Sequence, residues 1–469
     1  MTTDCTPHQF EFQGMTRRTV VASFDGGTLS SDGGVLLLAE VDRRLGLLEL
    51  FAACFKDHRN PGLVEHSIEE LVRQRVFGLA LGYEDLNDHD ELRTDPLLAS
   101  VVGKSDPTGS DRRQEQDRGK PLAGKSTLNR LEWGTVKQDR YRKISLDTEA
   151  VDRFFVDVFL GAYQKAPAEI VLDLDATDDP LHGEQEGRFF HGYYGGYCYL
   201  PLYIFCGSHL LCSRLREANV DASFGVVAEL ERIVARIRQR WPEVRIIVRG
   251  DSGFAREELM SWCESHCVDF VLGLARNARL QRALGGELEQ ARAQFEEFGK
   301  AARVFKDFVY RTKKSWSRQR RVVGKAEHLS KGANPRFIVT SLPSEKWSAQ
   351  ELYEKLYCAR GEMENRIKEQ QLCLFADRTS THHLNSNQVR LWFSSVAYVL
   401  LNELRRLGLA GTDLAQARCD TVRTKLLKIG AQVKVTVRRV WVHLASSYPY
   451  AALFEQVLGH LRASRPALA

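Results

Sequence analysis

The segment that most constrains the fold is Val244–Phe254, in which a run of apolar residues leads into an acid flanked by glycines. Its β-branched part, Val244–Val248, predicts a buried strand. Asp251 follows at the carboxyl end of that strand, where open α/β sheets place their ligands. Asp251 is therefore a candidate site residue. The alternative is that it only caps the helix expected from about Ala255.

The stretch from residue 168 to residue 275 predicts three strands, a helix, a strand, a helix and a strand. The expected strands are Glu169–Asp175, Tyr193–Phe205, Leu210–Arg216, Val244–Val248 and Val268–Leu274, and the expected helices are Val226–Arg240 and Glu257–His266. This order is typical of an RNase H-like mixed sheet, in which three strands form a meander and later strands run parallel. We therefore predict an α/β fold with an RNase H-like core, a β-rich insertion and a mainly helical N-terminal region.

The pattern divides the chain into five segments. They are a mainly helical region (1–150), the first part of the core (151–275), a β-rich basic insertion (276–345), the second part of the core (346–410) and a C-terminal region (411–469). Region 1–150 is predicted to bind DNA or, alternatively, to be a plain helical accessory region. Ser67 and Glu70 predict a capping box there. In the C-terminal region, Ala431–Val442 alternates apolar and polar residues and predicts one half-buried strand.

The net charge of +5 is unevenly distributed. Residues 300–325 hold ten Lys and Arg residues against one acid, Asp307, which suggests a polyanionic partner. One interpretation is a solvated hairpin. The other is a DNA-contacting ribbon, in which Trp316 stacks on an unpaired base. The DNA contacts predicted for this segment are Lys313, Lys314, Trp316, Arg318, Arg320 and Arg321.

The ten cysteines are scattered, without a CxxC pair or histidines at zinc spacing. The sequence shows neither a signal peptide nor an apolar run long enough to span a bilayer. We therefore expect a reduced, cytoplasmic protein.

A long helix is predicted from Gln350 to about Leu374. Its residues at spacings of three and four fall on one face, and they are Tyr357, Arg360, Glu364, Lys368 and Gln371. An ordinary amphipathic helix would place Leu and Val on the face that meets a sheet. This polar face favours a site over packing, and we pair Glu364 with Asp251.

Three carboxylates are thus expected to converge: one from the first strand, Asp251 from the fourth, and Glu364. Asp173 and Asp175 are both candidates for the first. Such a cluster of hard oxygen ligands suits Mg²⁺ or Mn²⁺, and two ions about 4 Å apart support phosphodiester transfer. Clustered acids without metal would repel one another, which makes a purely structural role for all three unfavourable.

Three ordered motifs extend this pattern: Leu172–Pro180, Arg249–Phe254, and a Tyr-x2-Arg-x3-Glu-x3-Lys-Glu signature that begins at Tyr357. Together they resemble the DDE-type transposases of bacterial insertion sequences, specifically the insertion-sequence-four superfamily and its branch designated thirteen-eighty. In that family one residue separates the first acid from a Thr. This spacing selects Asp175, which precedes Ala176 and Thr177, and leaves Asp173 as the second choice for the first acid.

The resemblance also implies roles for other residues. Tyr357 and Arg360 would contact the DNA backbone or ends, and the insertion with Trp316 would hold a hairpinned or flipped-out terminus. The family's phosphate-binding lysine falls at Gln371 here, so we assign that role to Lys368, one turn earlier.

The implied function is that of a bacterial, nucleoid-associated DNA transposase. Asp175, Asp251 and Glu364 would bind two Mg²⁺ ions, which Mn²⁺ could replace. The partners would be double-stranded DNA, as terminal inverted repeats and target, and a second copy of the chain in a homodimeric synaptic complex. The alternatives are a metal-dependent endonuclease that does not join strands, and a transposase-derived DNA-binding protein without catalysis.

Overall fold

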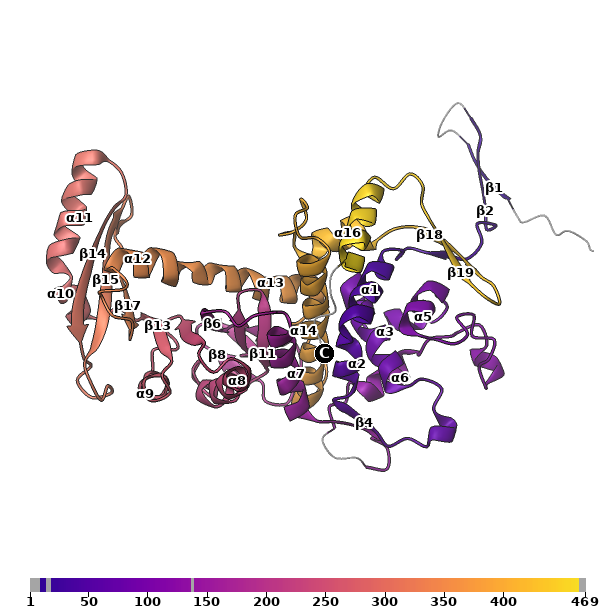
Figure 1. The fold of residues 1–469 in the computed structure, drawn as a ribbon, viewed down its shortest axis with the longest axis horizontal. Helices are drawn as coiled ribbons and strands as arrows, with labels where there is room; N and C mark the ends of the chain where they lie inside the picture. Colours follow the sequence, from indigo (N-terminus) through magenta and orange to yellow (C-terminus); the bar gives the residue numbers. More distant parts are fainter. Residues whose placement is uncertain (1–8, 14–17, 136–138, 464–469) are drawn as a thin grey trace, which may run out of the picture. The chain divides into compact units, whose positions relative to one another are not determined.

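The computed structural model describes residues 9–13, 18–135 and 139–463. The chain forms two compact units (Figure 1). The first takes the described residues of 1–132, 139–144 and 403–465, and the second takes mainly residues 145–402. Across the part of the chain that is described, no helix combines the length and the apolar character that crossing a membrane requires.

The first unit is mainly helical. Its elements are β1 (Gln9–Phe12), β2 (Val20–Ser23), β3 (Leu29–Ser30), α1 (Val35–Leu45), α2 (Leu47–Ala52), β4 (Phe55–Asp57), α3 (Ile68–Leu81), α4 (Asp88–Leu92), α5 (Pro96–Val102), α6 (Lys125–Leu131), α15 (Cys419–Val422), β18 (Ala431–Val435), β19 (Val440–Leu444) and α16 (Ala451–Ala463). The predicted capping box at the start of α3 is confirmed, because Ser67 and Glu70 each bond the other's backbone N–H.

The C-terminal segment is part of the first unit. Strand β18 pairs with β3, and the N–H of Gly33 donates to the carbonyl of Ile429 at 2.8 Å. Lys428 bonds Asp32 at 2.6 Å. The prediction of one strand over Ala431–Val442 is wrong: β18 and β19 form an antiparallel hairpin, because the chain turns at Thr436, whose N–H bonds the carbonyl of Arg439.

The second unit is built around a large mixed sheet. Its elements are α7 (Thr148–Gly161, preceded by β5, Ile144–Leu146), β6 (Glu169–Ala176), β7 (Asp179–Pro180), β8 (Phe189–His191), β9 (Gly196–Tyr199), β10 (Leu202–Cys206), β11 (His209–Arg214), α8 (Val226–Arg240), β12 (Arg245–Gly250), α9 (Glu257–Ser265), β13 (Asp269–Leu274), α10 (Ala278–Ala283), α11 (Gly285–Phe298), β14 (Ala302–Tyr310), β15 (Arg320–Leu329), β16 (Gly332–Ala333), β17 (Arg336–Thr340), α12 (Ala349–Glu351), α13 (Gly361–Leu374) and α14 (Leu384–Leu407).

The strand order confirms the predicted fold class. The sheet runs β11-β10-β6-β12-β13, with β6 antiparallel to β10 and parallel to β12, which is the RNase H-like arrangement. One element differs from the prediction. The strand expected over Tyr193–Phe205 is two strands, β9 and β10, separated at Leu200 and Pro201, because proline cannot donate a ladder hydrogen bond.

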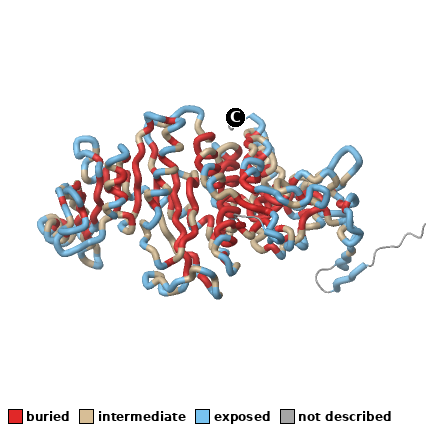
Figure 2. The backbone as a smooth tube through the Cα atoms, turned by 90° about the horizontal axis from the view of Figure 1, so that it is seen from below, coloured by how far each residue is buried: buried red, intermediate tan, exposed pale blue. Residues whose placement is uncertain are grey.

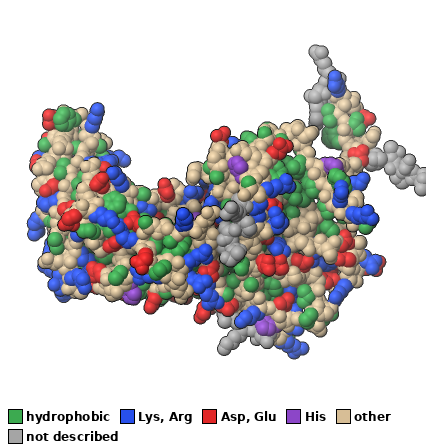
Figure 3. All heavy atoms as spheres, in the orientation of Figure 1, with side chains coloured by type: hydrophobic (Ala, Val, Ile, Leu, Met, Phe, Trp, Pro, Cys, Tyr) green, Lys and Arg blue, Asp and Glu red, His purple; other side chains and the backbone are tan. Residues whose placement is uncertain are grey.

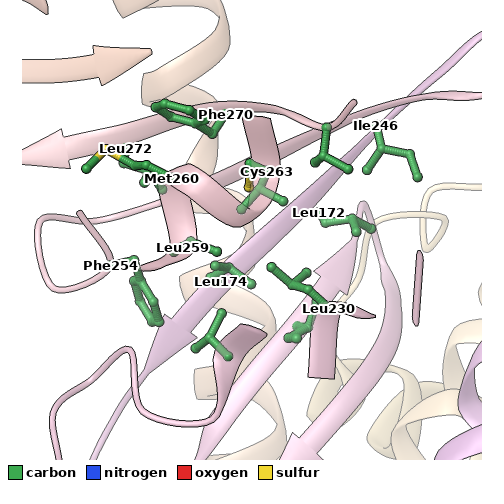
Figure 4. Packing of buried hydrophobic residues seen from close by; sticks show 14 of the residues in the cluster. Leu172, Leu174, Leu230, Ile246, Phe254, Leu259, Met260, Cys263, Phe270 and Leu272 are labelled. Atoms are coloured by element: carbon green, nitrogen blue, oxygen red, sulfur yellow. The ribbon is translucent and has the colours of Figure 1, made fainter. Parts of the chain in front are cut away.

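Helices α8 and α9 cover one face of this sheet. Figure 4 shows Leu172 and Leu174 of β6 packing with Leu230 of α8 and Met260 of α9. The strands of the sheet are buried along most of their length, with exposed loops at their ends (Figure 2). Side chains alternate along a strand, so the odd-numbered residues of β6 and β12 point to the opposite face. There Ile247 packs against the segment 352–357.

The β-rich insertion continues the core sheet. Strand β17 pairs antiparallel with β13, and β15 and β14 follow in order. The single helix expected over Leu280–Lys300 is two helices, α10 and α11, divided at Leu284 before the glycine pair Gly285–Gly286. The insertion therefore shares a continuous hydrogen-bonded ladder with the strands that carry the candidate acids.

One buried side chain ties three elements of the second unit together. Arg249 of β12 bonds both carboxylate oxygens of Asp173 on β6, at 2.5 and 2.7 Å. Its third contact is the backbone carbonyl of Leu356. Both charged side chains are less than a tenth exposed. The bidentate geometry satisfies the buried charges, and it joins the two parallel strands to the segment that leads into α13.

Replacing Arg249 with Met is expected to destabilise the second unit by about 3–5 kcal/mol, because Asp173 is left buried without a counter-charge. Urea unfolding followed by circular dichroism measures this loss. The matched control is Arg245→Met on the same strand, where more exposed ion pairs with Glu169 and Asp269 are removed at a cost of about 1 kcal/mol or less. Equal losses in the two variants would contradict the structural role of Arg249.

Candidate active site

The three predicted acids line one pocket of about 650 Å³. Asp175 comes from β6, Asp251 from the end of β12 and Glu364 from α13. Arg360 and Lys368 also line this pocket. The sequence therefore identified carboxylates that the fold brings to one place from three separate elements.

Strand register explains how Asp175 and Asp251 meet. In the parallel pair of β6 and β12, Arg249 is opposite Asp173 and Gly250 is opposite Leu174, so Asp251 follows level with Asp175. Helix α9 begins at Glu257, and its cap is Arg256 rather than Asp251. The carboxylate of Asp251 instead accepts from the N–H of Gly253 at 2.8 Å. The capping alternative for Asp251 is thus excluded.

The segment that carries Glu364 is not the continuous α-helix predicted over residues 350–374. Residues Leu352–Tyr357 form a π-helix and Cys358–Arg360 a 3₁₀ turn before α13 begins. Arg360, Glu364, Lys368 and Gln371 still share the pocket, whereas Tyr357 lines a neighbouring hollow of about 380 Å³. Such irregular helical turns are common at functional sites.

The two acids of β6 have different surroundings. Asp173 is buried with both oxygens bonded to Arg249 and does not line the pocket. Asp175 lines the pocket and accepts from the N–H of Ala176. The carboxylate of β6 that is available to a ligand is therefore Asp175.

Arg360 lies between two of the acids. Its guanidinium is 2.6 Å from a carboxylate oxygen of Glu364 and 3.8 Å from one of Asp175. Burial raises the pKa of Asp175 to about 7; Arg360 opposes this shift, and the charges of Asp251 and Glu364 add to it. The pocket thus holds more negative charge than Arg360 compensates.

Carboxylate oxygens from three elements are the donor chemistry that Mg²⁺ and Mn²⁺ prefer. As the side chains are placed, no three acid, His or Cys groups among the described residues converge closely enough to hold one ion. Two of the acids, Asp175 and Glu364, contact Arg360 instead. By the chemistry of their oxygen donors, Asp175, Asp251 and Glu364 fit a divalent ion.

Lys368 and Gln371 line the same pocket as Arg360, farther along α13. Gln371 donates to the carbonyl of Asp178 at 3.0 Å and to the carboxyl of Asp179 at 2.9 Å. Lys368 is exposed and has no ion-pair partner among the described residues. Its ammonium group is free to reach an anion at the pocket, whereas the Gln371 amide holds the strand β7.

Trp316 and Arg320 belong to the interior of the insertion. Trp316 is 4% exposed and packs edge-on against Tyr310 at 5.7 Å. Arg320 bonds Glu257 and Glu264 of α9. Stacking of the Trp316 ring on a base does not fit this placement, because the ring is covered, and Arg320 is already neutralised by two acids.

Most of the basic run is paired in the same way. Acids contact its cations between different elements in the pairs Arg303–Glu327, Lys306–Glu287, Arg318–Glu264 and Arg321–Asp307, and within β15 in the pair Lys325–Glu327. Figure 3 shows Lys and Arg side chains interspersed with Asp and Glu over the insertion. Lys313 and Lys314, at the tip of the β14–β15 connection, are exposed, as is Arg318, which is 65% exposed despite its ion pair.

Sequence reasoning missed two residues that shape the site. Arg249 fixes Asp173, and its position between a buried strand and Asp251 was the available signal. Gly273 of β13 lies beneath Tyr357: an added Cβ would stand 2.6 Å from the Tyr357 hydroxyl and 3.0 Å from the backbone of Asp251. Only the structure reveals that close approach.

Asp175→Asn is expected to stabilise the metal-free protein above about pH 7. The folded state raises the pKa of Asp175, so wild type loses stability as pH rises from the ordinary value near 4 to about 7. The amide removes that loss, and the two proteins should converge in acid. Thermal unfolding in EDTA at a series of pH values measures this difference in stability.

Asp221→Asn is the control with the opposite expected effect. Burial raises the pKa of Asp221, but the hydrogen bond with Arg256 opposes burial and the net pKa is lowered, so removing this charge should cost stability at neutral pH. A pH-independent difference between Asp175→Asn and wild type would contradict this electrostatic account.

The chain was compared with protein-family models, curated proteins and solved structures. No curated protein sequence matches it. Among solved structures it is similar to a piggyBac transposase in a synaptic complex with hairpin DNA, determined by cryo-EM, with 12% identity and a TM-score of 0.41 over 84% of this chain and 79% of that one. Residues 12–466 match the family model described as Transposase DDE domain group 1. The chain therefore belongs to this family of DDE transposases.

Proposed function

We propose that the protein is an active DNA transposase that cleaves at the ends of an insertion sequence and transfers the resulting 3′-OH into target DNA. The observation that carries this proposal is the meeting of Asp175, Asp251 and Glu364 in one pocket. Burial makes the charged form of Asp175 costly to keep in this pocket. A DNA-binding protein that had lost catalysis would have no need to keep three acids from three elements there.

In this proposal Asp175, Asp251 and Glu364 hold two Mg²⁺ ions, or Mn²⁺ in their place. The ions would supply activation of the attacking hydroxyl and stabilisation of the leaving oxygen. Arg360 serves as a counter-charge to Asp175 and Glu364 in the metal-free protein. With cations on the acids, its guanidinium would be available to bind a DNA phosphate at the pocket.

Two further groups of lysines would bind DNA phosphates. Lys368 extends from the pocket wall, and Lys313 and Lys314 extend from the tip of the β14–β15 connection. Tyr357, in the adjoining hollow with Arg276 and Arg336, would contact the strand as it leaves the pocket. Binding through phosphates should weaken as salt rises, because each contact releases condensed counterions.

The finer family assignment is also a proposal. The Tyr-x2-Arg-x3-Glu signature from Tyr357 to Glu364 supports the insertion-sequence-four superfamily and its branch designated thirteen-eighty. Pairing of two element ends would require a homodimeric synaptic complex, with terminal inverted repeats and target DNA as ligands.

The test is incubation of purified protein with DNA that carries the flanks of its own gene, in Mg²⁺ and in EDTA. Wild type should release 3′-OH ends and form joined products only with the metal. Asp251→Asn and Glu364→Gln should each lower the cleavage rate by more than about a hundredfold. Loss of a residue that only orients a metal ligand already costs up to about a hundredfold, and loss of the ligand itself should cost at least as much. Glu184→Gln, an exposed acid, should leave cleavage unchanged.

The products also separate the proposal from its main alternative. Metal-dependent cutting without joined products would identify an endonuclease of the same fold. Cleavage by Asp251→Asn and Glu364→Gln at the wild-type rate would show that these acids are not the catalytic centre.

A further inference from the structure

An aromatic hairpin borders the candidate active site. It comprises residues 188–199, in which β8 and β9 pair around a glycine-rich turn. Three of its rings are largely in solvent: Phe190 is 59% exposed, Tyr193 86% and Tyr197 48%. A concentration of exposed aromatic surface on a folded protein marks an interaction site.

The tip of the aromatic hairpin belongs to the pocket itself. His191, Tyr193 and Tyr194 line the same cavity as Asp175 and Asp251. The rings of His191 and Tyr194 lie 4.9 Å apart, and those of Tyr193 and Tyr194 lie 5.0 Å apart nearly at right angles. A ligand bound in this cavity would therefore meet both the acids and these rings.

The tip is built to hold these rings in place. The N–H of Gly195 donates to the carbonyl of His191 at 2.9 Å, and Gly195 has a φ of +71°, which a side chain would strain. The hydroxyl of Tyr194 bonds the carbonyl of Ala176, the residue after Asp175. Around Gly192, Gly195 and Gly196 nothing lies within 4 Å of an added Cβ, so the approach to the tip is open.

The outer face of the hairpin continues the aromatic surface. Phe190 and Tyr197 are directly opposite in the strand register, with ring centroids 5.7 Å apart. The guanidinium of Arg188 lies 4.7 Å from the centre of the Tyr197 ring. Aromatic rings with an interleaved cation are the surface on which bases of single-stranded nucleic acid stack.

We propose that the aromatic hairpin binds unpaired bases of the DNA strand whose phosphate enters the pocket, with Tyr193 as the principal stacking residue. This inference rests on the proposed function, because that function brings a DNA strand to Asp175 and Asp251. Bases must be unpaired and unstacked to offer a free ring face, and DNA opened at a cleaved end offers such bases. Trp316, which the sequence had suggested for this role, is buried.

The test compares two duplexes of identical sequence in EDTA, one blunt and one with a short single-stranded overhang that contains 2-aminopurine. Fluorescence anisotropy measures affinity, and 2-aminopurine quenching reports stacking. Wild type should bind the overhang duplex more tightly than the blunt one and quench the probe. Tyr193→Ala should bind the overhang duplex roughly tenfold more weakly and lose the quenching.

Two variants complete the design. Tyr193→Phe should keep both overhang affinity and quenching, because the ring and not the hydroxyl stacks. Phe298→Ala removes a ring of comparable exposure, 63%, at the end of α11, and should behave as wild type. All variants should bind the blunt duplex equally.

The outcomes separate this inference from the proposed function. Equal overhang affinity and quenching in wild type and Tyr193→Ala would overturn the stacking role, even if wild type cuts element ends in Mg²⁺. If wild type prefers the overhang duplex and Tyr193→Ala does not, but wild type fails to cut element ends in Mg²⁺, only the proposed transposase activity would be overturned. Failure to bind either duplex would overturn both.

Discussion

The buried ion pair of Arg249 and Asp173 is the interaction on which the candidate site depends. Arg249 lies two residues before Asp251, and Asp173 lies two residues before Asp175. The third contact of Arg249, with the carbonyl of Leu356, fixes the segment that continues into the helix of Glu364. One guanidinium thus sets the relative positions of the three elements that carry the acids. A buried pair of this kind adds little net stability over an apolar pair, but it specifies one arrangement.

Electrostatics distinguishes this arrangement of acids from ordinary packing. Asp175 is half-buried and shares its pocket with Asp251 and Glu364, and its partial burial raises its pKa to about 7 despite the presence of Arg360. Clustered acids of this kind are costly without cations, so Arg360 compensates two of them in the metal-free protein. The guanidinium of Arg360 and the exposed Lys368 line the same pocket as the acids. The aromatic hairpin adds ring surface to the lining of the same pocket.

Local patterns predicted much of this unit. The apolar run of β12 and the periodicity of α8 indicated the RNase H-like sheet, and the register of β6 and β12 then brought Asp175 beside Asp251. What failed depended on distant partners. The basic run was counted within its own segment, whereas Glu257, Glu264 and Glu287 neutralise it from other elements. Burial of Trp316 against Tyr310, and the π-helical turn before Glu364, likewise follow from tertiary packing that no local pattern contains.

The central claim is that Asp175, Asp251 and Glu364 form one divalent-metal site. The most direct test is a titration of the DNA-free protein with Mn²⁺, in which electron paramagnetic resonance measures the free ion. Wild type is predicted to bind Mn²⁺, and the triple variant Asp175→Asn, Asp251→Asn, Glu364→Gln is predicted to lose that binding while keeping its fold by circular dichroism. Equal Mn²⁺ binding by the two proteins would show that the ion is held elsewhere and would contradict the account.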